Sequence, residues 1–450
     1  MEKYTLKPLK TVTTFLSYPF KSFMQANSLG GNLLLLSLIL GLFLANSQYQ
    51  NQYHALWQQH LGFFWGDYKF EKSMLHFIND GLMAIFFFLV GLEIKRELLV
   101  GELSVPKKAL FPVAAALGGV IFPAIFFSLL QFGNAETLRG WAVPTATDIA
   151  FALGILSLLG SKVPISLKIF LTALAIVDDI VAILLIGIFY SAPPNLIALA
   201  VATILLFVMF YLNHYGIRNL SVYLFLAILL WYAIFLSGIH ATLAGVLAAF
   251  TIPVKVSLTR QAAADKSKKL VKKLHDLSSS SAEILGDKAY QKVLSQLSKI
   301  YVQAGTPLER LEHKLHPLVS YFILPLFAFA NSGITIDGAM FYSLLEPLSL
   351  GIIFGLCFGK PIGITFICYL LDKLKLTEKP ANMSWQQLWA SGFFAGIGFT
   401  MSILIASLAF DNIHLLNQAK LSIIVASALA IILGTLLLLL DPKTNTPPKH

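Results

Sequence analysis

Four ionisable residues, Asp148, Asp178, Asp179 and Lys360, each lie inside a long apolar stretch of the sequence. If those stretches cross a membrane, each bare charge costs about 2.5–3.5 kcal/mol, even on lenient insertion scales. Such a cost needs a chemical reason, and binding an ion or carrying a proton would supply one. These four residues are therefore the first candidates for the chemistry of the chain.

Asp178 and Asp179 are adjacent in the sequence Ile-Val-Asp-Asp. On a helix they project about 100° apart, so both can reach one polar cavity between helices. Two carboxylates that share a site cannot both ionise at low cost, so the pair can hold either protons or a hard cation such as sodium or lithium. The alternative is a structural ion pair between Asp178 and Lys360, in which one lysine cannot neutralise both carboxylates.

Thr147 and Asp148 end the sequence Pro-Thr-Ala-Thr-Asp at 144–148, which interrupts an apolar span. Glycines interrupt another span at 396–402. Matching interruptions in the two halves of a transporter indicate an ion site near the middle of the membrane. Where two broken helices cross, helix ends of like sign face each other. We therefore expect Asp148 to neutralise the positive ends and Lys360 the negative ends. The alternative for Thr147 is a hydrogen bond within its own helix, and for Lys360 it is snorkelling to an interface.

The composition indicates which elements must position these residues. Of the 450 residues, 57% are hydrophobic and 12% are charged, against about 25% charged in soluble domains. So high a hydrophobic content excludes an ordinary soluble enzyme. It also excludes a disordered chain, because disordered segments have low hydrophobicity. Long apolar runs predict an all-α membrane protein with many spans. No motif indicates a cofactor, and Cys357 and Cys368 share one apolar run, where we expect them to pack as small hydrophobic side chains.

Twelve apolar stretches are predicted to be transmembrane spans, although some differ from the roughly 20 residues of a straight span. Spans three to five and ten to twelve are expected to form an inverted repeat, with spans four and eleven as the broken, crossing helices. Lys360 is the one basic residue that we place deep within a span, because Lys168 and Lys420, each the second residue of a span, are counted with the flanking loops. The spans cover residues 31–47, 75–93, 109–131, 144–159, 167–190, 195–213, 220–237, 239–254, 317–333, 345–371, 388–410 and 419–440.

The formal net charge of +10 reflects 33 Lys and Arg against 23 Asp and Glu. In a soluble protein this excess would indicate a nucleic-acid partner. Here most basic residues lie on the cytoplasmic side of the predicted membrane if both termini are cytoplasmic, as the positive-inside rule requires. We therefore expect no nucleic-acid partner. We expect cytoplasmic ends at 1–30 and 441–450, with spans one to eight in 31–254 and spans nine to twelve in 317–440.

Residues 255–316 interrupt the spans with 12 Lys and Arg against 6 Asp and Glu. Apolar residues recur at helical spacing in Leu270–Leu277 and in Val293–Ile300, and Ser278–Ser281 separate the two runs. This predicts a cytoplasmic helical hairpin, which is either a solvated linker or an element that lies on anionic lipid. The longest outside loop, 48–74, is predicted to be an interfacial or β-hairpin element.

Several motifs resemble those of the NhaA family of bacterial sodium/proton antiporters. The resemblance extends from about residue 30 to 440. The basic segment near 258–306 looks longer than the corresponding loop of the best-known members, so the resemblance assigns it no role. The matching motifs are Asn79–Leu98, Thr145–Ala152, Ile176–Asp179, Leu311–Pro317 and Leu324–Asn331.

The resemblance implies a transporter rather than an enzyme. Such a protein exchanges external protons for internal sodium or lithium across the bacterial inner membrane, by alternating access and with more protons entering than sodium leaving. It implies that Asp178 and Asp179 bind the cation and carry protons, and that Lys360 pairs with Asp178. It places Thr147 and Asp148 at the crossing of the broken helices. It also implies a homodimer formed through the loop 48–74.

Family members are silent at acidic pH and active at alkaline pH, and the resemblance implies a set of pH-response residues. The residue types alone support this set less strongly. Glu93, Arg96 and Glu97 lie at the end of a span, where an anchor would lie. His313 and His316 can titrate near neutrality, although an isolated interfacial histidine is more often a hydrogen-bonded anchor. The full set is Glu93, Arg96, Glu97, His240, Glu312, His313 and His316.

Two other functions were weighed against antiport. An intramembrane aspartyl protease requires a Gly-x-Gly-Asp motif, whereas Gly396-Ile397-Gly398 is followed by Phe399. A sodium-coupled solute symporter would need a roomier substrate site with aromatic or arginine contacts, and no arginine lies in a predicted span. Both are less favoured than antiport.

Overall fold

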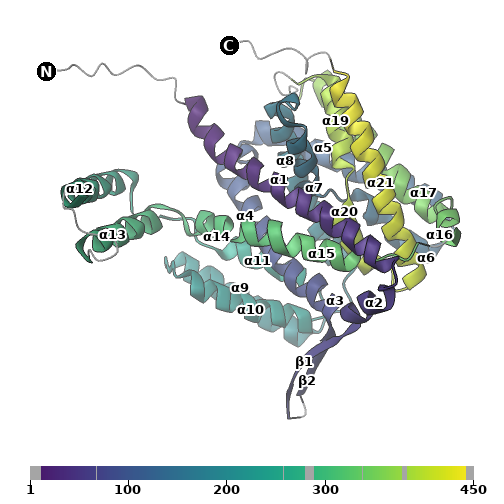
Figure 1. Cartoon of the computed structure of the whole chain (residues 1–450), viewed down its shortest axis with the longest axis horizontal. Helices are drawn as coiled ribbons and strands as arrows, with labels where there is room; N and C mark the ends of the chain where they lie inside the picture. Colours follow the sequence, from purple (N-terminus) through teal and green to yellow (C-terminus); the bar gives the residue numbers. More distant parts are fainter. Residues whose placement is uncertain are drawn as a thin grey trace. The chain divides into compact units, whose positions relative to one another are not determined.

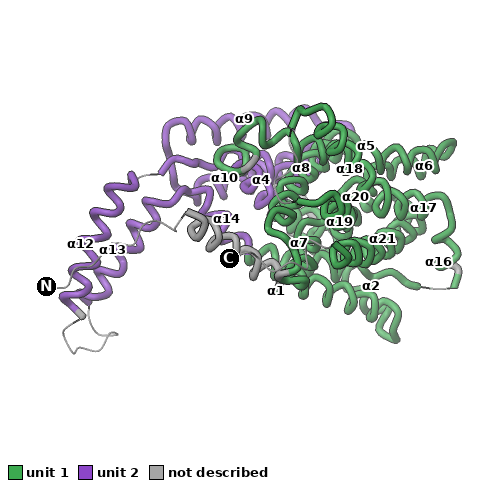
Figure 2. Tube along the Cα trace, turned by 90° about the horizontal axis from the view of Figure 1, so that it is seen from above, with its two compact units in different colours: residues 1–86, 97–192, 317–450 green, residues 87–96, 193–316 purple. Residues whose placement is uncertain are grey.

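The structure is a computed structural model that describes residues 12–66, 68–256, 258–278, 288–336, 338–377 and 383–441. The described chain is helical except for one pair of strands, so the prediction of an all-α fold is confirmed apart from a single hairpin. It divides into two compact units (Figure 2). Unit 1 comprises residues 1–86, 97–192 and 317–450, and unit 2 comprises residues 87–96 and 193–316.

Unit 1 contains most of the helices in Figure 1. Within it, α1 packs against α7 and α15, α5 packs against α8 and α18, and α19 packs against α18 and α21. Its helices are α1 (Val12–Ala45), α2 (Gln50–Gln58), α3 (Met74–His76), η1 (Phe77–Leu82), the ends of α4 (Met83–Val100), η2 (Glu102–Ser104), α5 (Pro106–Leu130), α6 (Ala135–Leu138), η3 (Arg139–Thr145), α7 (Ile149–Leu158), η4 (Gly160–Lys162), α8 (Ile165–Phe189), η5 (Val319–Ile323), α15 (Leu324–Asn331), α16 (Gly338–Ser343), α17 (Pro347–Phe354), η6 (Gly355–Gly359), α18 (Lys360–Lys373), α19 (Trp385–Ala395), α20 (Phe399–Ala409) and α21 (Ile413–Leu439).

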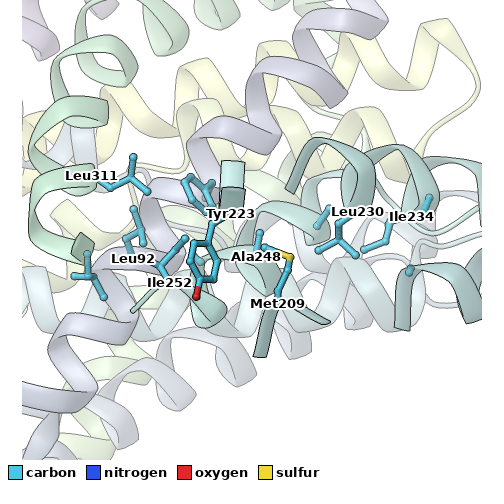
Figure 3. Packing of buried hydrophobic residues seen from close by; sticks show 14 residues of the cluster. Leu92, Met209, Tyr223, Leu230, Ile234, Ala248, Ile252 and Leu311 are labelled. Carbon is cyan, nitrogen blue, oxygen red and sulfur yellow. The ribbon is translucent and has the colours of Figure 1, made fainter. Parts of the chain in front are cut away.

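Unit 2 is built around the middle of α4 and an apolar core of its own (Figure 3). Leu92 of α4 packs in this core with Met209, Tyr223 and Ile252. The Tyr223 hydroxyl donates to the carbonyl of Ile217, so the polar end of this buried ring is satisfied. The remaining helices of this unit are α9 (Leu196–His214), α10 (Leu220–Leu236), α11 (Thr242–Thr251), α12 (Arg260–Ser278), α13 (Lys288–Ala304) and α14 (Pro307–Leu318).

Six helical stretches of the described residues are long and apolar enough to cross a membrane. Three bent helix pairs raise this number to nine if each pair is one span, and α10 and α11 are shorter apolar helices. The chain is therefore a multi-pass membrane protein, whereas the number twelve stays a prediction. The six stretches are Met74–Val100, Pro106–Leu130, Ile165–Phe189, Leu196–His214, Pro347–Lys373 and Ile413–Leu439.

Two of the bent pairs occur at the interruptions noted in the sequence. The segment Ala135–Thr145 and helix α7 meet at 45°, as do helices α19 and α20. Pro144 has no amide hydrogen to donate, and the backbone at Ala146 and Asp148 is extended. Asp148 then starts α7 as its N-cap. The predicted break in each of these two apolar segments is confirmed.

Two predictions for the polar segments also match described elements. The loop 48–74 contains α2 and an antiparallel hairpin of β1 (His60–Trp65) and β2 (Tyr68–Ser73), in which His60 pairs with Ser73. Helices α12 and α13 pack against each other as predicted for 255–316. Most of the predicted break at Ser278–Ser281 lies outside the described residues.

One expectation about charge placement is wrong. Lys360 is not the only buried lysine of the long apolar helices, because Lys168 in α8 and Lys420 in α21 are 8% and 7% exposed. Each is the second residue of a predicted span and was counted with the loop before it, whereas α8 already begins at Ile165 and α21 at Ile413. The described helices extend past the apolar runs that were used to define the spans.

Candidate ion-binding site between two broken helices

Three elements of unit 1 carry the candidate residues, and two more supply backbone groups. Thr147 and Asp148 lie in the break before α7, Asp178 and Asp179 lie in the middle of α8, and Lys360 is the first residue of α18. Helices α19 and α20 supply backbone groups at the second break. All five side chains are between 0% and 3% exposed. The structure therefore gathers the five candidates in the buried interior of unit 1.

Asp148 joins the two breaks. Its Oδ1 accepts from the amide of Phe151, and its Oδ2 accepts from both the amide and the hydroxyl of Thr400. Phe151 and Thr400 lie in the first turns of α7 and α20, so one carboxylate satisfies the amino ends of both half-helices. The amide of Asp148 also donates to the carbonyl of Ile397 at 2.7 Å.

Lys360, Thr147 and Asp178 form a second buried network. Lys360 Nζ donates to Asp178 Oδ2 at 2.7 Å and also to Thr147 Oγ1. Thr147 Oγ1 lies 2.6 Å from Asp178 Oδ2 and 2.8 Å from the carbonyl oxygen of Ala395, which ends α19. The partners of Thr147 thus belong to other helices, not to its own turn. Lys360 is fully buried, so it does not snorkel to an interface.

Asp178 uses only one of its two oxygens in this network. Its Oδ1 is buried and has no hydrogen-bond partner. Leaving a buried carboxylate oxygen unsatisfied is costly, so such an atom needs a proton, a cation or water. Asp179 follows in the same helix turn and lies within electrostatic reach of Lys360. Two carboxylates beside one ammonium leave one negative charge for a proton or a monovalent cation to balance.

Two of the predicted pH-response residues, Arg96 and Glu312, form an ion pair in unit 2. Arg96 Nη1 lies 2.8 Å from Glu312 Oε1 of α14. His316 is one turn further along α14, and burial, followed by the charges of His313 and Arg96, lowers its pKa from the ordinary histidine value. His313 itself is exposed. The Arg96–Glu312 ion pair and His316 therefore form one charged cluster.

Three further members of the predicted set, Glu93, Glu97 and His240, lie in α4 or just before α11. His240 lies just before the first residue of α11, whereas Lys95 Nζ donates to the carbonyls of Phe250 and Ile252 at the opposite end of this helix. Ten helical residues separate these ends by about 15 Å. Glu93 and Glu97 are partly exposed residues of α4. The role of Lys95 as a cap for α11 was not predicted, because a lysine at a span end looks like any anchor.

Thr400 is a further site residue that the sequence analysis did not single out. It lies in the interruption at 396–402, and its position in the first turn of a half-helix is the signal that could have identified it. The backbone carbonyls of Ala395 and Ile397 also contribute. No pattern of side chains reveals these carbonyls before the fold is known.

The chain is similar to known proteins along nearly its whole length. Residues 21–438 match the family described as Na+/H+ antiporter 1. The chain is 44% identical over 431 residues to the Na(+)/H(+) antiporter NhaA of Oleidesulfovibrio alaskensis, covering 96% of each chain. It is 42% identical over 432 residues to the Na(+)/H(+) antiporter NhaA of Helicobacter pylori strain J99, covering 96% of this chain and 97% of that one.

Among solved structures, the sodium proton antiporter MjNhaP1 of Methanocaldococcus jannaschii matches with a TM-score of 0.44 and 14% identity, over 96% of this chain and 100% of that one. The family match and the curated relatives show a membrane transport protein of the antiporter class. The chain belongs to the NhaA family of Na+/H+ antiporters.

Proposed function

We propose that the chain is an electrogenic, pH-regulated antiporter that exports sodium or lithium in exchange for protons. It would reside in the bacterial inner membrane with both termini in the cytoplasm. Family membership supports sodium/proton exchange. The observation that carries the proposed site is the open Oδ1 of Asp178, buried beside Lys360 and one residue from Asp179.

The exchange follows from charge balance at the two aspartates. When both are protonated, Lys360 supplies the only charge of this trio. When sodium or lithium enters, two protons leave, and the cation and Lys360 balance the two carboxylates. The loaded and the protonated site would then differ by one charge per cycle, which makes the exchange electrogenic. We propose that Asp178 Oδ1 and the Asp179 carboxylate bind the cation, and that the site is exposed to either side in turn.

The inverted repeat gives this alternation a structural basis in the proposal. Spans three to five and ten to twelve would be related by inversion, so the two breaks would lie at the same depth. Asp148 satisfies the amino ends of both half-helices. Thr147 and Lys360 lie at the carboxyl end of α19. The crossing therefore carries compensated charges, and the ion would bind without removing them.

The transport test uses everted membrane vesicles that are acidified inside and report the pH gradient by fluorescence quenching. Adding sodium or lithium at alkaline pH should collapse the gradient in the wild type. Asp179→Asn should abolish this response, and Asp178→Asn should reduce the rate at least tenfold, because each change removes a negative charge that the cation requires. Collapsing the membrane potential with valinomycin and potassium should speed sodium-driven proton movement.

The matched control is Asp411→Asn, since the Asp411 side chain is 99% exposed and its ion-pair partner, Arg139 at 3.8 Å, is also exposed. This variant should transport like the wild type. A fully active Asp179→Asn variant would rule out the proposed site. If neither sodium nor lithium collapses the pH gradient in wild-type vesicles, the exchange itself is ruled out.

For pH regulation, we propose that protonation of His316 weakens the charged cluster around Arg96 and Glu312. The folded-state pKa of His316 lies below the ordinary value of 6.5. The protonated form is therefore disfavoured by the fold. The stability that depends on neutral His316 is fully present above pH 6.5, and it is lost as the pH falls from there through the folded-state pKa.

His316→Gln should therefore reduce the loss of thermal stability between pH 7.5 and pH 5, and it should move the activation of transport to more acidic pH. Thermal unfolding in detergent at both pH values and a pH profile of vesicle transport measure these effects. His313→Gln, at an exposed position of the same helix, is the control with the smaller effect. Identical pH profiles for wild type and His316→Gln would contradict the assignment.

A further inference from the structure

A cavity of about 710 Å³ lies in unit 1 where three long apolar helices end. Its walls come from the amino-terminal ends of α5 and α8 and from the loop that follows α18. These helices belong to stretches that can cross a membrane, Pro106–Leu130, Ile165–Phe189 and Pro347–Lys373. Because all three end here, the cavity is at the level where a membrane protein meets lipid headgroups.

The lining changes from charged to apolar along the helix axes. In α5, Lys107 and Lys108 lie in the first turn, and Phe111 lies one turn deeper in the span. In α8, Ser166 lies in the first turn, and Phe170 follows one turn later. The two phenylalanine rings pack together with centroids 5.6 Å apart. The cavity thus has a basic mouth and an apolar inner part, which is the polarity profile of a lipid molecule.

The loop after α18 adds a third lysine and an unsatisfied hydroxyl. The amide of Lys375 donates to Asp372, and the amide of Leu376 donates to Leu371, which terminates the helix. Lys375 has a φ of 55°, a conformation that usually carries glycine. The Thr377 hydroxyl lines the same cavity, is buried, and has no hydrogen-bond partner. No Asp or Glu is among the described residues of this lining.

We propose that this cavity binds an anionic phospholipid. The headgroup phosphate of the lipid contacts Lys107, Lys108 and Lys375 and accepts a hydrogen bond from Thr377. One acyl chain of the lipid packs along Phe111 and Phe170. Basic pockets at the ends of transmembrane helices bind such headgroups through charge, and the acyl chain adds hydrophobic burial. A free phosphate would use only the basic mouth, and a zwitterionic lipid would bring no net negative charge to the lysines.

The experiment measures lipid binding rather than transport, so it does not depend on the proposed exchange. The purified full chain in a neutral detergent is titrated with phosphatidylglycerol, with phosphatidylcholine or with inorganic phosphate, and unfolding is followed by temperature. Phosphatidylglycerol should raise the thermal midpoint of the wild type by at least about 3 °C, since ligand stabilisation grows with concentration relative to Kd. The other two additions should raise it by less than a third as much.

The test variant combines Lys107→Gln with Lys375→Gly, because glycine suits the backbone at 375 and the helix end is expected to fold at least as well. The control combines Lys162→Gln with Lys373→Gln, which removes the same charge at two described positions outside the lining. Native mass spectrometry counts the phosphatidylglycerol molecules that each protein retains. The test variant should lose at least one bound lipid and most of the thermal shift, and the control should keep both.

Equal shifts from inorganic phosphate and phosphatidylglycerol would overturn the lipid assignment in favour of a soluble anion. Equal shifts from phosphatidylcholine would reduce the binding to nonspecific lipid solvation. A test variant that keeps the wild-type shift and lipid count would show that this cavity is not the binding site.

Discussion

Asp148 and Asp178 are both buried carboxylates of the same site, but their surroundings differ in one decisive respect. Both oxygens of Asp148 accept hydrogen bonds from the first turns of two half-helices. Asp178 accepts from Lys360 and Thr147 on one oxygen and leaves the other open. A fully satisfied carboxylate has no reason to exchange its partners, whereas an unsatisfied one gains from each proton or cation that binds. This difference is the basis for our proposal that Asp148 compensates the helix ends and that Asp178 takes part in the exchange.

The buried Lys360–Asp178 pair makes a specific prediction for stability. Removing one partner of a buried pair leaves an uncompensated charge, which costs about 3–5 kcal/mol. Lys360→Leu should therefore lower the thermal midpoint strongly. The double variant Lys360→Leu/Asp178→Asn removes both charges and should recover most of that loss, without recovering normal transport. Thermal unfolding in detergent of the wild type, both single variants and the double variant measures the coupling between the two residues.

If the double variant is as unstable as Lys360→Leu alone, the two charges do not depend on each other. The pair would then not be the reason that Lys360 is buried.

The identities of Asp148, Asp178, Asp179 and Lys360 could be predicted from the sequence because a charge in an apolar run is conspicuous. Their detailed partners could not. Thr400 is an ordinary hydroxyl residue, and the carbonyls of Ala395 and Ile397 carry no side-chain signal. Lys168 and Lys420 were missed for a related reason: each lies at the start of a predicted apolar span, where a charge normally reaches water, yet the fold buries both.

At the scale of elements, the site depends on helices that stop and restart inside the protein. The breaks before α7 and α20 were predictable, because proline, threonine and glycine interrupt apolar runs there. Their exact geometry was not, since it depends on contacts between segments about 250 residues apart, such as the bond from Thr147 to Ala395. Local sequence can weaken a helix, but only the opposing segment determines where its free carbonyls find donors.

The packing of α5 against α18 gives a prediction at this scale. A Cβ added at Gly118 would lie 2.4 Å from the carbonyl oxygen of Gly363, so the two helices approach through bare backbone. A Cβ at the neighbouring Gly119 would meet only the Ile364 side chain, at 3.1 Å. Gly118→Ala should cost about 1–3 kcal/mol, because backbone cannot yield as a side chain can. Gly119→Ala should be nearly neutral, since the helix propensity of alanine offsets the contact.

Thermal unfolding and vesicle transport of both alanine variants test this packing. Because α18 begins with Lys360, the Gly118→Ala variant should also transport more slowly. Equal stability of the two variants would show that the helices can separate at this crossing without cost.

For the whole molecule, composition and apolar runs were sufficient to predict a helical, multi-pass membrane protein. The number of spans was harder to predict, because α10 and α11 are short and three other candidates are bent pairs. Length and hydropathy define a span only when one straight helix crosses the bilayer. The sites where this chain departs from that rule include the two breaks that hold the proposed ion site.

The hairpin of β1 and β2 leads to the last prediction, which concerns assembly. A two-stranded sheet is marginally stable alone, and each strand leaves one edge of backbone groups unpaired. The predicted dimer contact through 48–74 would supply a partner for those edges. Replacing residues 61–72 by Asn-Gly keeps the ends together, since His60 pairs with Ser73 and the amide of Met74 donates to the carbonyl of Gln59. Helix α2 should stay in place, because the Tyr53 hydroxyl donates to the carbonyl of Phe329.

The shortened protein should therefore fold and transport sodium but be largely monomeric by native mass spectrometry in mild detergent, where the wild type should be dimeric. Loss of folding would be detected by the thermal midpoint and would be separable from loss of the dimer. If the shortened protein remains dimeric at the same concentrations as the wild type, the strands are not the contact. Since the ion-site residues described above all lie within one chain, transport by the monomer is the outcome that their geometry requires.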